Sequence, residues 1–410
     1  MWIQIIEGTA AARGRGAGPA PEATWAQFGE ETLLLSDEAE EPRGRARGAA
    51  RGRRVDASRE ELHVVVQNGR LFQQLNPDVP VIHDRGRYLL VQIAPERAQG
   101  LSGSHPTCYG IFPLAGREVV FEAGAARAAR APAAFVLDAV NRLQRASLEA
   151  SLGKLVSFQS RHSTGQGFGK AATWARQQLN LLNFQTRTQT VPVNGANSRN
   201  VIADKPGAGA GARQVVLVTA HLDSINLQGG PAAPAPGADD NGSGSAGLLE
   251  IARALSGLRN SQDLRFILFG GEEQGLFGSR RYVASLTSAE RGRIRAVVNM
   301  DMIGTLNTPR RSLLIEGAPV SRNIIEEMGR AASAHTQLAV ETSLHAANSD
   351  HVPFIDAGLP AVLAIEGADN TNANVHSARD VEEHINFDYC LEILRAVTGF
   401  VAQAVGEVVL

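Results

Sequence analysis

VVLVTAHLDSINLQGGPAAPAPGADDNGSGSAGLLEIARAL, residues 215–255, decides the fold of this 410-residue chain. The continuous apolar run at 215–220 predicts a buried β-strand, and the end of the stretch has apolar residues at helical spacing. The loop between them is rich in Gly, Pro and Ala and carries four titratable residues, His221, Asp223, Asp239 and Asp240. The stretch therefore predicts a strand, a loop with reactive side chains, and a helix opened by small residues.

Strands and helices alternate on both sides of this stretch. Apolar runs predict strands at 186–193, 198–207, 213–221, 264–271, 295–304, 311–317 and 360–367. Helical spacing predicts helices at 134–158, 167–184, 242–258, 274–286, 322–334 and 386–405. Continuous apolar strands that alternate with helices favour a mostly parallel sheet covered on both faces. Residues 135–410 are therefore predicted to form one doubly wound α/β domain.

Residues 1–130 have a different pattern and are predicted to form a small β-rich domain. Short runs rich in Val, Leu, Ile and Tyr, separated by Gly, Pro and Asn, predict strands between 61 and 123. An Arg/Gly/Ala-rich segment near 37–57 is predicted to be flexible. This segment does not predict RNA binding, because no aromatic residues are interleaved to stack on bases. No motif indicates what the N-terminal domain does.

Composition excludes several classes of function. Forty basic and 42 acidic residues give a net charge of -2, so no overall field attracts nucleic acid or an anionic membrane. Apolar stretches are shorter than the roughly 20 residues of a membrane span. Cys108 and Cys390 are too few and too far apart for a disulfide framework or a thiolate metal site. The N-terminus lacks the pattern of a signal peptide, and the compartment and oligomeric state stay open.

Titratable residues follow three predicted central strands at their carboxyl ends, where open parallel sheets bind ligands. One strand ends at His221, the next leads to Glu272 and Glu273, and the third leads to Asp301. Asp240 and His376 lie on loops that belong to the same edge. No Lys or Arg is adjacent in sequence to any of these residues, and several buried carboxylates need a cation. Imidazole and carboxylate ligands without thiolate favour Zn²⁺, with Mn²⁺ or Co²⁺ as substitutes, and one shared carboxylate allows two ions.

The motifs of this region resemble, in the same order, those of the co-catalytic zinc aminopeptidases. This family includes secreted bacterial leucyl aminopeptidases, with glutamate carboxypeptidase and the transferrin receptor ectodomain as more distant relatives. The resemblance covers roughly residues 140–408 and rests on AHLDS (220–224), PGADDNGSG (236–244), GGEEQGLFGS (270–279), NMDMIG (299–304), SDHVPF (349–354) and VHSARD (375–380). It implies a zinc exopeptidase fold and two zinc ions per chain. The implied ligands are His221 and Asp301 for one ion, Glu273 and His376 for the other, and Asp240 as the bridge.

The same resemblance implies the chemistry. Glu272 is the implied general base, which takes a proton from a water that bridges the two metal ions. Asp223 is the implied carboxylate that fixes the tautomer of the liganding His221. The peptide bond after Asp240 is cis in the family. The implied activity is hydrolysis of the N-terminal peptide bond of peptides that have a free N-terminus.

Other interpretations stay open. A carboxypeptidase or dipeptidase of the same fold would need a cation for the substrate carboxylate, for which Arg280, Arg281 and Arg322 are candidates. A glutaminyl cyclase with one zinc ion, or a non-catalytic binding protein, fits a complete set of five ligands less well. For residues without an assigned role, we expect Asp350 to cap a helix, His351 to line the pocket, and Asp380 to orient His376 or to cap a helix.

Overall fold

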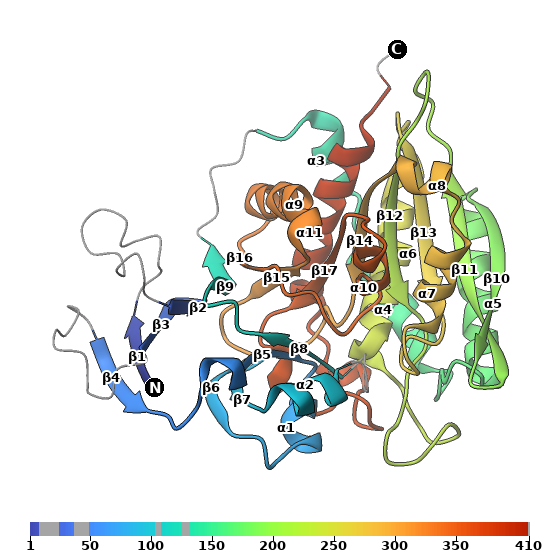
Figure 1. Cartoon of the computed structure of the whole chain (residues 1–410). Coiled ribbons are helices and arrows are strands. Elements are labelled where there is room, and N and C mark those ends of the chain that lie inside the picture. Colours follow the sequence, from blue (N-terminus) through green and yellow to red (C-terminus); the bar gives the residue numbers. More distant parts are fainter. Residues whose placement is uncertain (8–23, 37–48, 103–107, 125–130, 409–410) are drawn as a thin grey trace.

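One mixed β-sheet runs through the computed structural model, which describes residues 1–7, 24–36, 49–102, 108–124 and 131–408 (Figure 1). Its strands, in the order in which they pair, are β10 (Gln185–Val193), β11 (Ala196–Lys205), β13 (Asp263–Phe269), β12 (Val215–His221), β14 (Ile294–Met300), β17 (Ala361–Glu366), β15 (Ser312–Glu316), β16 (Ala339–Ser343), β9 (Arg117–Gly124), β2 (Thr24–Phe28), β3 (Glu31–Ser36), β1 (Trp2–Glu7) and β4 (Ala49–Arg54). β13, β12, β14 and β17 are mutually parallel, so their carboxyl ends lie along one edge.

A second, smaller sheet contains β6 (Val81–Arg85), β7 (Tyr88–Gln92), β5 (Leu62–Gln67) and β8 (Tyr109–Pro113), in that order. With α1 (Leu71–Leu75) and α2 (Pro95–Leu101) it forms what we call the small-sheet unit, drawn in blue and teal at the bottom of Figure 1. Val65 and Leu89 pack with Phe72 of α1 on one face of this sheet. Val64 on the other face packs against a cluster that contains residues of the large sheet. The unit is thus attached to the large sheet through an apolar layer.

Helices cover both faces of the parallel part of the large sheet. One face packs against α3 (Ala134–Asn141), α4 (Arg145–Val156), α5 (Gln166–Leu181), α6 (Gly244–Leu255), α9 (Arg322–His335) and α11 (Phe387–Val405). The other face packs against α7 (Phe277–Ser285) and α10 (Val352–Asp356), and α8 (Ser288–Arg293) precedes β14. Within the described residues, no helix has both the length and the apolar character needed to cross a membrane.

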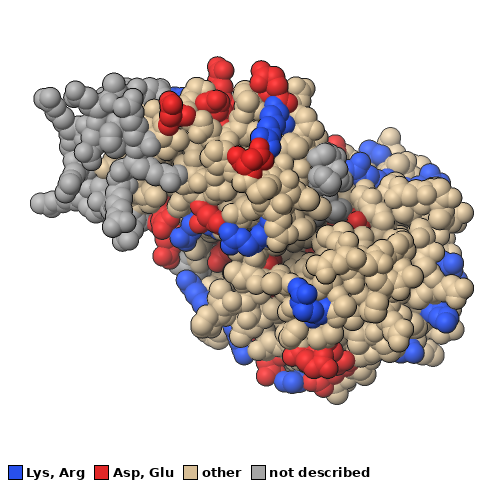
Figure 2. All heavy atoms as spheres, turned by 90° about the horizontal axis from the view of Figure 1, so that it is seen from below, with Lys and Arg blue, Asp and Glu red and all other residues tan. Residues whose placement is uncertain are grey.

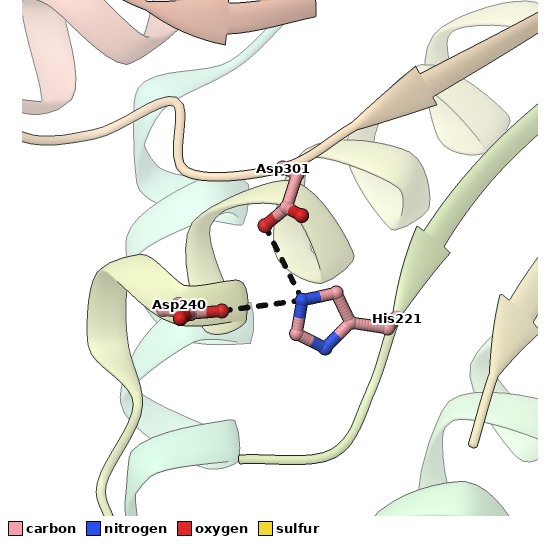
Figure 3. Close-up of side chains that lie close together, drawn as sticks. All are labelled: His221, Asp240 and Asp301. Atoms are coloured by element: carbon pink, nitrogen blue, oxygen red, sulfur yellow. Dashed lines mark hydrogen bonds and ion pairs between the residues drawn. The ribbon is translucent and has the colours of Figure 1, made fainter. Parts of the chain in front are cut away.

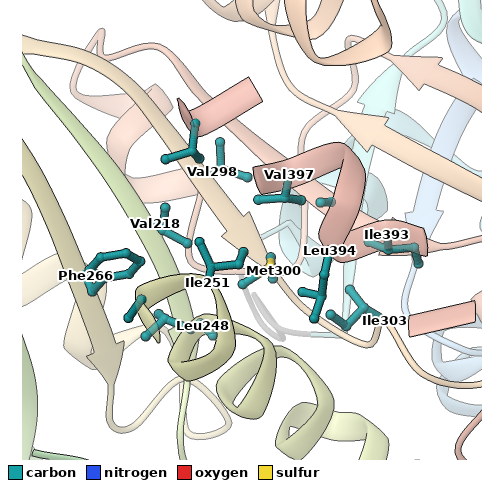
Figure 4. Packing of buried hydrophobic residues seen from close by; sticks show 14 of the residues in the cluster. Val218, Leu248, Ile251, Phe266, Val298, Met300, Ile303, Ile393, Leu394 and Val397 are labelled. Carbon is teal, nitrogen blue, oxygen red and sulfur yellow. The ribbon is translucent and has the colours of Figure 1, made fainter. Parts of the chain in front are cut away.

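The main core lies between the sheet and the helices α6 and α11 (Figure 4). Alternate residues of the central strands, such as Val218, Phe266 and Val298, point into this core, where they meet Ile251 of α6 and Leu394 of α11. Strand residues one position along, such as Leu217, face α7 and α10 instead. Burial on both faces explains the continuous apolar runs of these strands and fixes where each strand ends.

The α/β fold predicted from the sequence is confirmed. Several details differ: the helix predicted at 134–158 is divided into α3 and α4, and β16, α8 and the short helices α1 and α2 were not predicted. In the segment near 37–57 that was predicted to be flexible, residues 37–48 lie outside the described residues, and Ala49–Arg54 form β4, which pairs with β1. The boundary predicted between 130 and 135 does not interrupt the sheet, because β9 pairs with β16.

Candidate metal centre

The carboxyl ends of three parallel strands bring the predicted site residues together. His221 is the last residue of β12 and is level with Phe269 of β13, three residues before Glu272. Asp301 follows β14 directly and lies on the other side of β12. All three side chains are buried. The strand pairing therefore places at one sheet edge groups that are 80 residues apart in the chain.

Asp240 lies between two histidines and faces each of them with a different oxygen. His221 Nε2 is 3.2 Å from Asp240 Oδ1 and 3.2 Å from Asp301 Oδ1 (Figure 3). His376 Nε2 is 3.0 Å from Asp240 Oδ2 and 3.0 Å from Glu273 Oε2. The potential ligand atoms of each group lie within 4.8 Å of one another. The structure thus forms two adjacent groups of possible metal ligands that share one carboxylate.

The electrostatics of the site fit a bound cation. Burial raises the pKa of Glu273 to about 7, with the Asp240 charge adding to the effect. Burial also raises the pKa of Glu272 well above its usual range, although His221 opposes the shift. Glu273 Oε1 is buried and has no hydrogen-bond partner among the described residues. Nitrogen and oxygen donors without sulfur, together with uncompensated negative charge, are the donor set that zinc accepts.

Glu272 and Glu273 are consecutive but face different groups. Glu272 Oε2 is 4.0 Å from His221 Nε2, whereas Glu273 contacts His376. Asp223 accepts hydrogen bonds from the backbone N–H groups of both glutamates, at 3.4 and 3.3 Å. Its carboxylate is 3.7 Å from His221 Nδ1, which lies nearer to the Asp223 carbonyl oxygen at 3.2 Å. Asp223 therefore positions the glutamate loop as well as facing the imidazole.

Two residues that the sequence did not assign hold the loop that carries Asp240. The Asp380 carboxylate accepts hydrogen bonds from the backbone N–H groups of Asp239 and Asp240, at 2.9 and 3.0 Å. Among the described residues no hydrogen bond joins Asp380 to His376, so the expectation that it orients this imidazole is not met; its carboxylate lies instead at the first turn of η3 (Ala238–Ser243). The fully buried guanidinium of Arg161 donates to the carbonyl oxygens of Leu222 and Gly237, both at 2.8 Å. The loop is thus fixed at both ends, and its Asp240–Asn241 peptide bond is cis.

Asp239 points away from the two histidines. Its carboxylate accepts hydrogen bonds from Gly304 N at 3.0 Å and from Asn372 Nδ2 at 2.8 Å. Within the described part of the chain, no backbone N–H group donates to the carboxylate of its neighbour Asp240, which faces the histidines instead. The two consecutive aspartates therefore have different partners. Asp239 accepts hydrogen bonds from neighbouring loops, whereas Asp240 faces the two histidines of the candidate metal centre.

Arg87, which directly precedes β7, connects the small-sheet unit to the loops behind the centre. Its guanidinium donates to both carboxylate oxygens of Glu316, at 2.9 and 3.2 Å, and to Asp369 at 3.2 Å. Glu316 also accepts hydrogen bonds from Tyr88 Oη at 2.8 Å and from Ala347 N at 3.1 Å. Burial would raise the pKa of Glu316, but Arg87, with a further contribution from His351, lowers it to about 2.

The segment 347–351 continues from this network to the metal centre. Ser349 Oγ donates to Asp301 Oδ2 at 2.6 Å. His351 is completely buried, with Nε2 3.5 Å from Glu316 Oε1, so it faces the network and does not line a pocket as expected. Asp350 does not cap a helix either, because α10 begins at Val352 and His351 is its N-cap residue.

Comparison with known proteins identifies relatives of this chain. Residues 200–401 match the sequence profile of Peptidase family M28. The chain is 30% identical over 285 residues to a probable leucine aminopeptidase from Arthroderma otae, an alignment that covers 64% of this chain and 73% of that protein. It is 33% identical over 233 residues to leupeptin-inactivating enzyme 1 from Streptomyces exfoliatus, covering 55% of this chain and 50% of that protein. This chain therefore spans only half the length of the Streptomyces protein.

A solved structure has the same fold. The zinc aminopeptidase BSAP from Bacillus subtilis superimposes with a TM-score of 0.57 at 20% identity, covering 64% of this chain and 95% of that one. The shared part is large enough to contain the parallel sheet and its helices. The likeness concerns the fold, and the sequence relatives carry the family assignment.

Proposed function

The chain belongs to peptidase family M28 and is a metallopeptidase, and we propose that it is an aminopeptidase that removes N-terminal residues at a centre of two zinc ions. The observation that carries this proposal is the position of Asp240, with one oxygen near His221 and the other near His376. A carboxylate that must face two cations explains why acids are concentrated here. Two-metal hydrolases use this kind of shared ligand.

In this proposal His221 and Asp301 hold one zinc ion, Glu273 and His376 hold the other, and Asp240 holds both. The distances within each group support this division of the ligands. Bound zinc supplies Lewis acidity, which polarises a peptide carbonyl and makes water acidic at neutral pH. Mn²⁺ and Co²⁺ accept the same donor set and are expected to substitute.

Glu272 is the proposed general base, and geometry and environment both support this role. Its carboxylate faces the His221 group, while Glu273 faces His376. Burial raises its pKa, so the carboxylate can take up a proton and hold it until it passes to the leaving amine. Asp223 fixes the backbone of Glu272 and thereby the position of the base.

The substrates of this proposal are peptides with a free N-terminus, whose ammonium group would be attracted by the buried carboxylates. A carboxypeptidase would need a cation at the centre for the substrate carboxylate. The candidates raised from the sequence do not supply one: Arg280 and Arg281 lie exposed on α7, and Arg322 begins α9. These three arginines therefore do not favour carboxypeptidase activity, and the leucine aminopeptidase relative favours aminopeptidase activity.

Metal analysis and one substrate test the proposal. The purified protein is expected to hold two zinc ions per chain and to hydrolyse Leu-p-nitroanilide, with activity lost on chelation and restored by zinc. A protein with two zinc ions that cleaves C-terminally but not N-terminally would indicate the carboxypeptidase alternative. A protein that holds no zinc would indicate a non-catalytic relative.

A further inference from the structure

A polar groove lies beside the metal centre, between the small-sheet unit and the loops of the peptidase domain. It has a volume of about 190 Å³, and one of its walls contains His376. The small-sheet unit contributes residues from 68 to 74, which include Asn68, Arg70 and Gln74. The peptidase domain contributes Leu227, Gln228 and residues between 372 and 379. The groove therefore begins at a proposed zinc ligand and is completed by the N-terminal part of the chain.

The charge of this groove is opposite to that of the metal centre. Two arginines, Arg70 and Arg379, line it together with four side-chain amides, and no Asp or Glu is among the lining residues. Figure 2, which shows the molecule from below, has Lys and Arg side chains on both sides of the hollow in the middle of this face. A cationic groove rich in amide donors attracts an anion, and carboxylates are the anions that guanidinium groups bind best in peptides.

Arg379 is the cation that is available for a ligand. Its Nη2 donates to the Ala373 carbonyl oxygen at 2.9 Å, which orients the guanidinium without neutralising it. Its side chain is exposed, and among the described residues no carboxylate lies within ion-pair distance of it. Arg70, in contrast, is 2.9 Å from Asp84, so part of its charge is already compensated. Arg379 is thus the stronger candidate, with Arg70 in support.

We propose that this groove binds a carboxylate of the substrate on the leaving-group side of the scissile bond. The inference rests on the proposed aminopeptidase function and names its preferred substrates: dipeptides and tripeptides with a free C-terminus, or peptides with an acidic residue after the cleaved bond. An extended residue spans at most about 3.6 Å, so the terminal carboxylate of such a short peptide stays close to the bond that is cleaved. The small-sheet unit then acts as a wall that completes a specificity site.

The test compares substrates that differ only in charge. Leu-Gly and Leu-Gly-amide differ in the terminal carboxylate, and Leu-Asp-amide places a carboxylate on the side chain instead. The wild-type enzyme is expected to have a kcat/KM about tenfold or more higher for Leu-Gly than for its amide, as expected for a charge-assisted hydrogen bond. The ratio for Leu-Asp-amide then shows whether a side-chain carboxylate is accepted as well as the terminal one.

The variant Arg379→Met is expected to reduce the ratio of kcat/KM for Leu-Gly to kcat/KM for Leu-Gly-amide to about one. Arg379→Lys is expected to keep part of this ratio, because the positive charge remains. Arg322→Met, at the start of α9 and outside the groove, is the matched control and is expected to keep the full ratio. Zinc content and thermal unfolding are measured for each variant, to check that the protein is folded and contains zinc when the ratio is determined. If Arg379→Met does not fold, Arg70→Met, expected to lower the ratio partially, takes its place.

Equal kcat/KM values for Leu-Gly and its amide in the wild-type enzyme, or an unchanged ratio in Arg379→Met, would overturn the carboxylate site. Zinc content and Leu-p-nitroanilide hydrolysis test the proposed function separately, since this substrate has no carboxylate on its leaving group. Activity on Leu-p-nitroanilide without a preference for Leu-Gly therefore refutes the groove alone. Absence of zinc and of all hydrolysis refutes both.

Discussion

Replacement of Arg87 by methionine tests whether the small-sheet unit is an integral part of the peptidase. The substitution keeps most of the side-chain volume but removes the charge that lies between Glu316 and Asp369. Both carboxylates are buried, and Glu316 has no exposed surface. We expect a large loss of stability, because removal of one partner leaves buried charges without compensation.

The magnitude follows from the pKa of Glu316, which is lowered from its usual 4.5 to about 2. This difference of roughly 2.5, at about 1.4 kcal/mol for each pKa unit, corresponds to roughly 3.5 kcal/mol in favour of the charged carboxylate, with Arg87 as the largest favourable contribution and His351 as the next. Removal of a partner from a buried ion pair costs about 3–5 kcal/mol in other proteins. Both values predict a decrease of about 3 kcal/mol or more in the free energy of unfolding at neutral pH.

The assay is denaturant unfolding at pH 7, followed by tryptophan fluorescence and by circular dichroism. Arg97→Met is the matched control. Arg97 belongs to the same unit, but its ion pair with Asp78 is exposed, so no measurable change in the free energy of unfolding is expected.

The pH dependence of the free energy of unfolding gives a second check. A lowered carboxylate pKa stabilises the folded protein above pH 4.5, and this contribution is lost as the pH falls towards 2, so the two proteins should converge on acidification. A decrease below about 1 kcal/mol at pH 7 would refute the reasoning.

Three further predictions concern the metal centre. Glu272→Gln is expected to abolish turnover while the protein keeps both zinc ions by elemental analysis, whereas loss of zinc would mean that the roles of Glu272 and Glu273 are exchanged. Asp240→Asn is expected to weaken both zinc sites in a chelator competition, while Asp239→Asn keeps them, because Asp239 contacts Gly304 and Asn372 instead. Removal of zinc is expected to make stability fall as the pH rises from about 4.5 to about 7, because burial raises the pKa of Glu273 to about 7 and the folded protein then binds more protons than the unfolded one. Calorimetry of metal-free and zinc-loaded protein at pH 5 and 8 measures this, and an equal pH dependence of the two forms would contradict it.

The sequence alone was enough to predict which candidate site residues follow the parallel strands and meet at one edge of the sheet. His221, Glu272, Glu273 and Asp301 come at the ends of apolar runs, and the pairing of β12 with β13 and β14 brings them to one edge as predicted. Such runs can be recognised because both faces of the strands are buried and leave a continuous apolar pattern. The order of the strands was not needed, because parallel neighbours place all their carboxyl ends on the same side.

The connection between the N-terminal region and the site could not be predicted in this way. Arg87 is 229 residues away from Glu316, and an arginine in a polar turn has no local pattern that indicates burial. The pairing of β9 with β16 is equally hidden, because neighbouring strands are joined through backbone groups that every residue has. A region that has its own strand pattern therefore looks independent in the sequence, although its ion pairs and groove residues belong to the peptidase.

Burial also explains why consecutive acids at this centre have different roles that composition cannot distinguish. Asp223, Asp239 and Asp380 each accept hydrogen bonds from backbone N–H groups. Burial raises the pKa of Asp239 and of Asp380, and these backbone hydrogen bonds oppose that shift. Among the residues that the structure describes, no backbone N–H group donates to the carboxylates of Asp240 and Glu273, which face histidines, and one buried oxygen of Glu273 has no hydrogen-bond partner. A backbone donor can be assigned only when the loops are folded around one another. The carboxylates that the backbone leaves uncompensated are therefore the ones that we expect to require a cation: Asp240 lies between His221 and His376, and Glu273 faces His376.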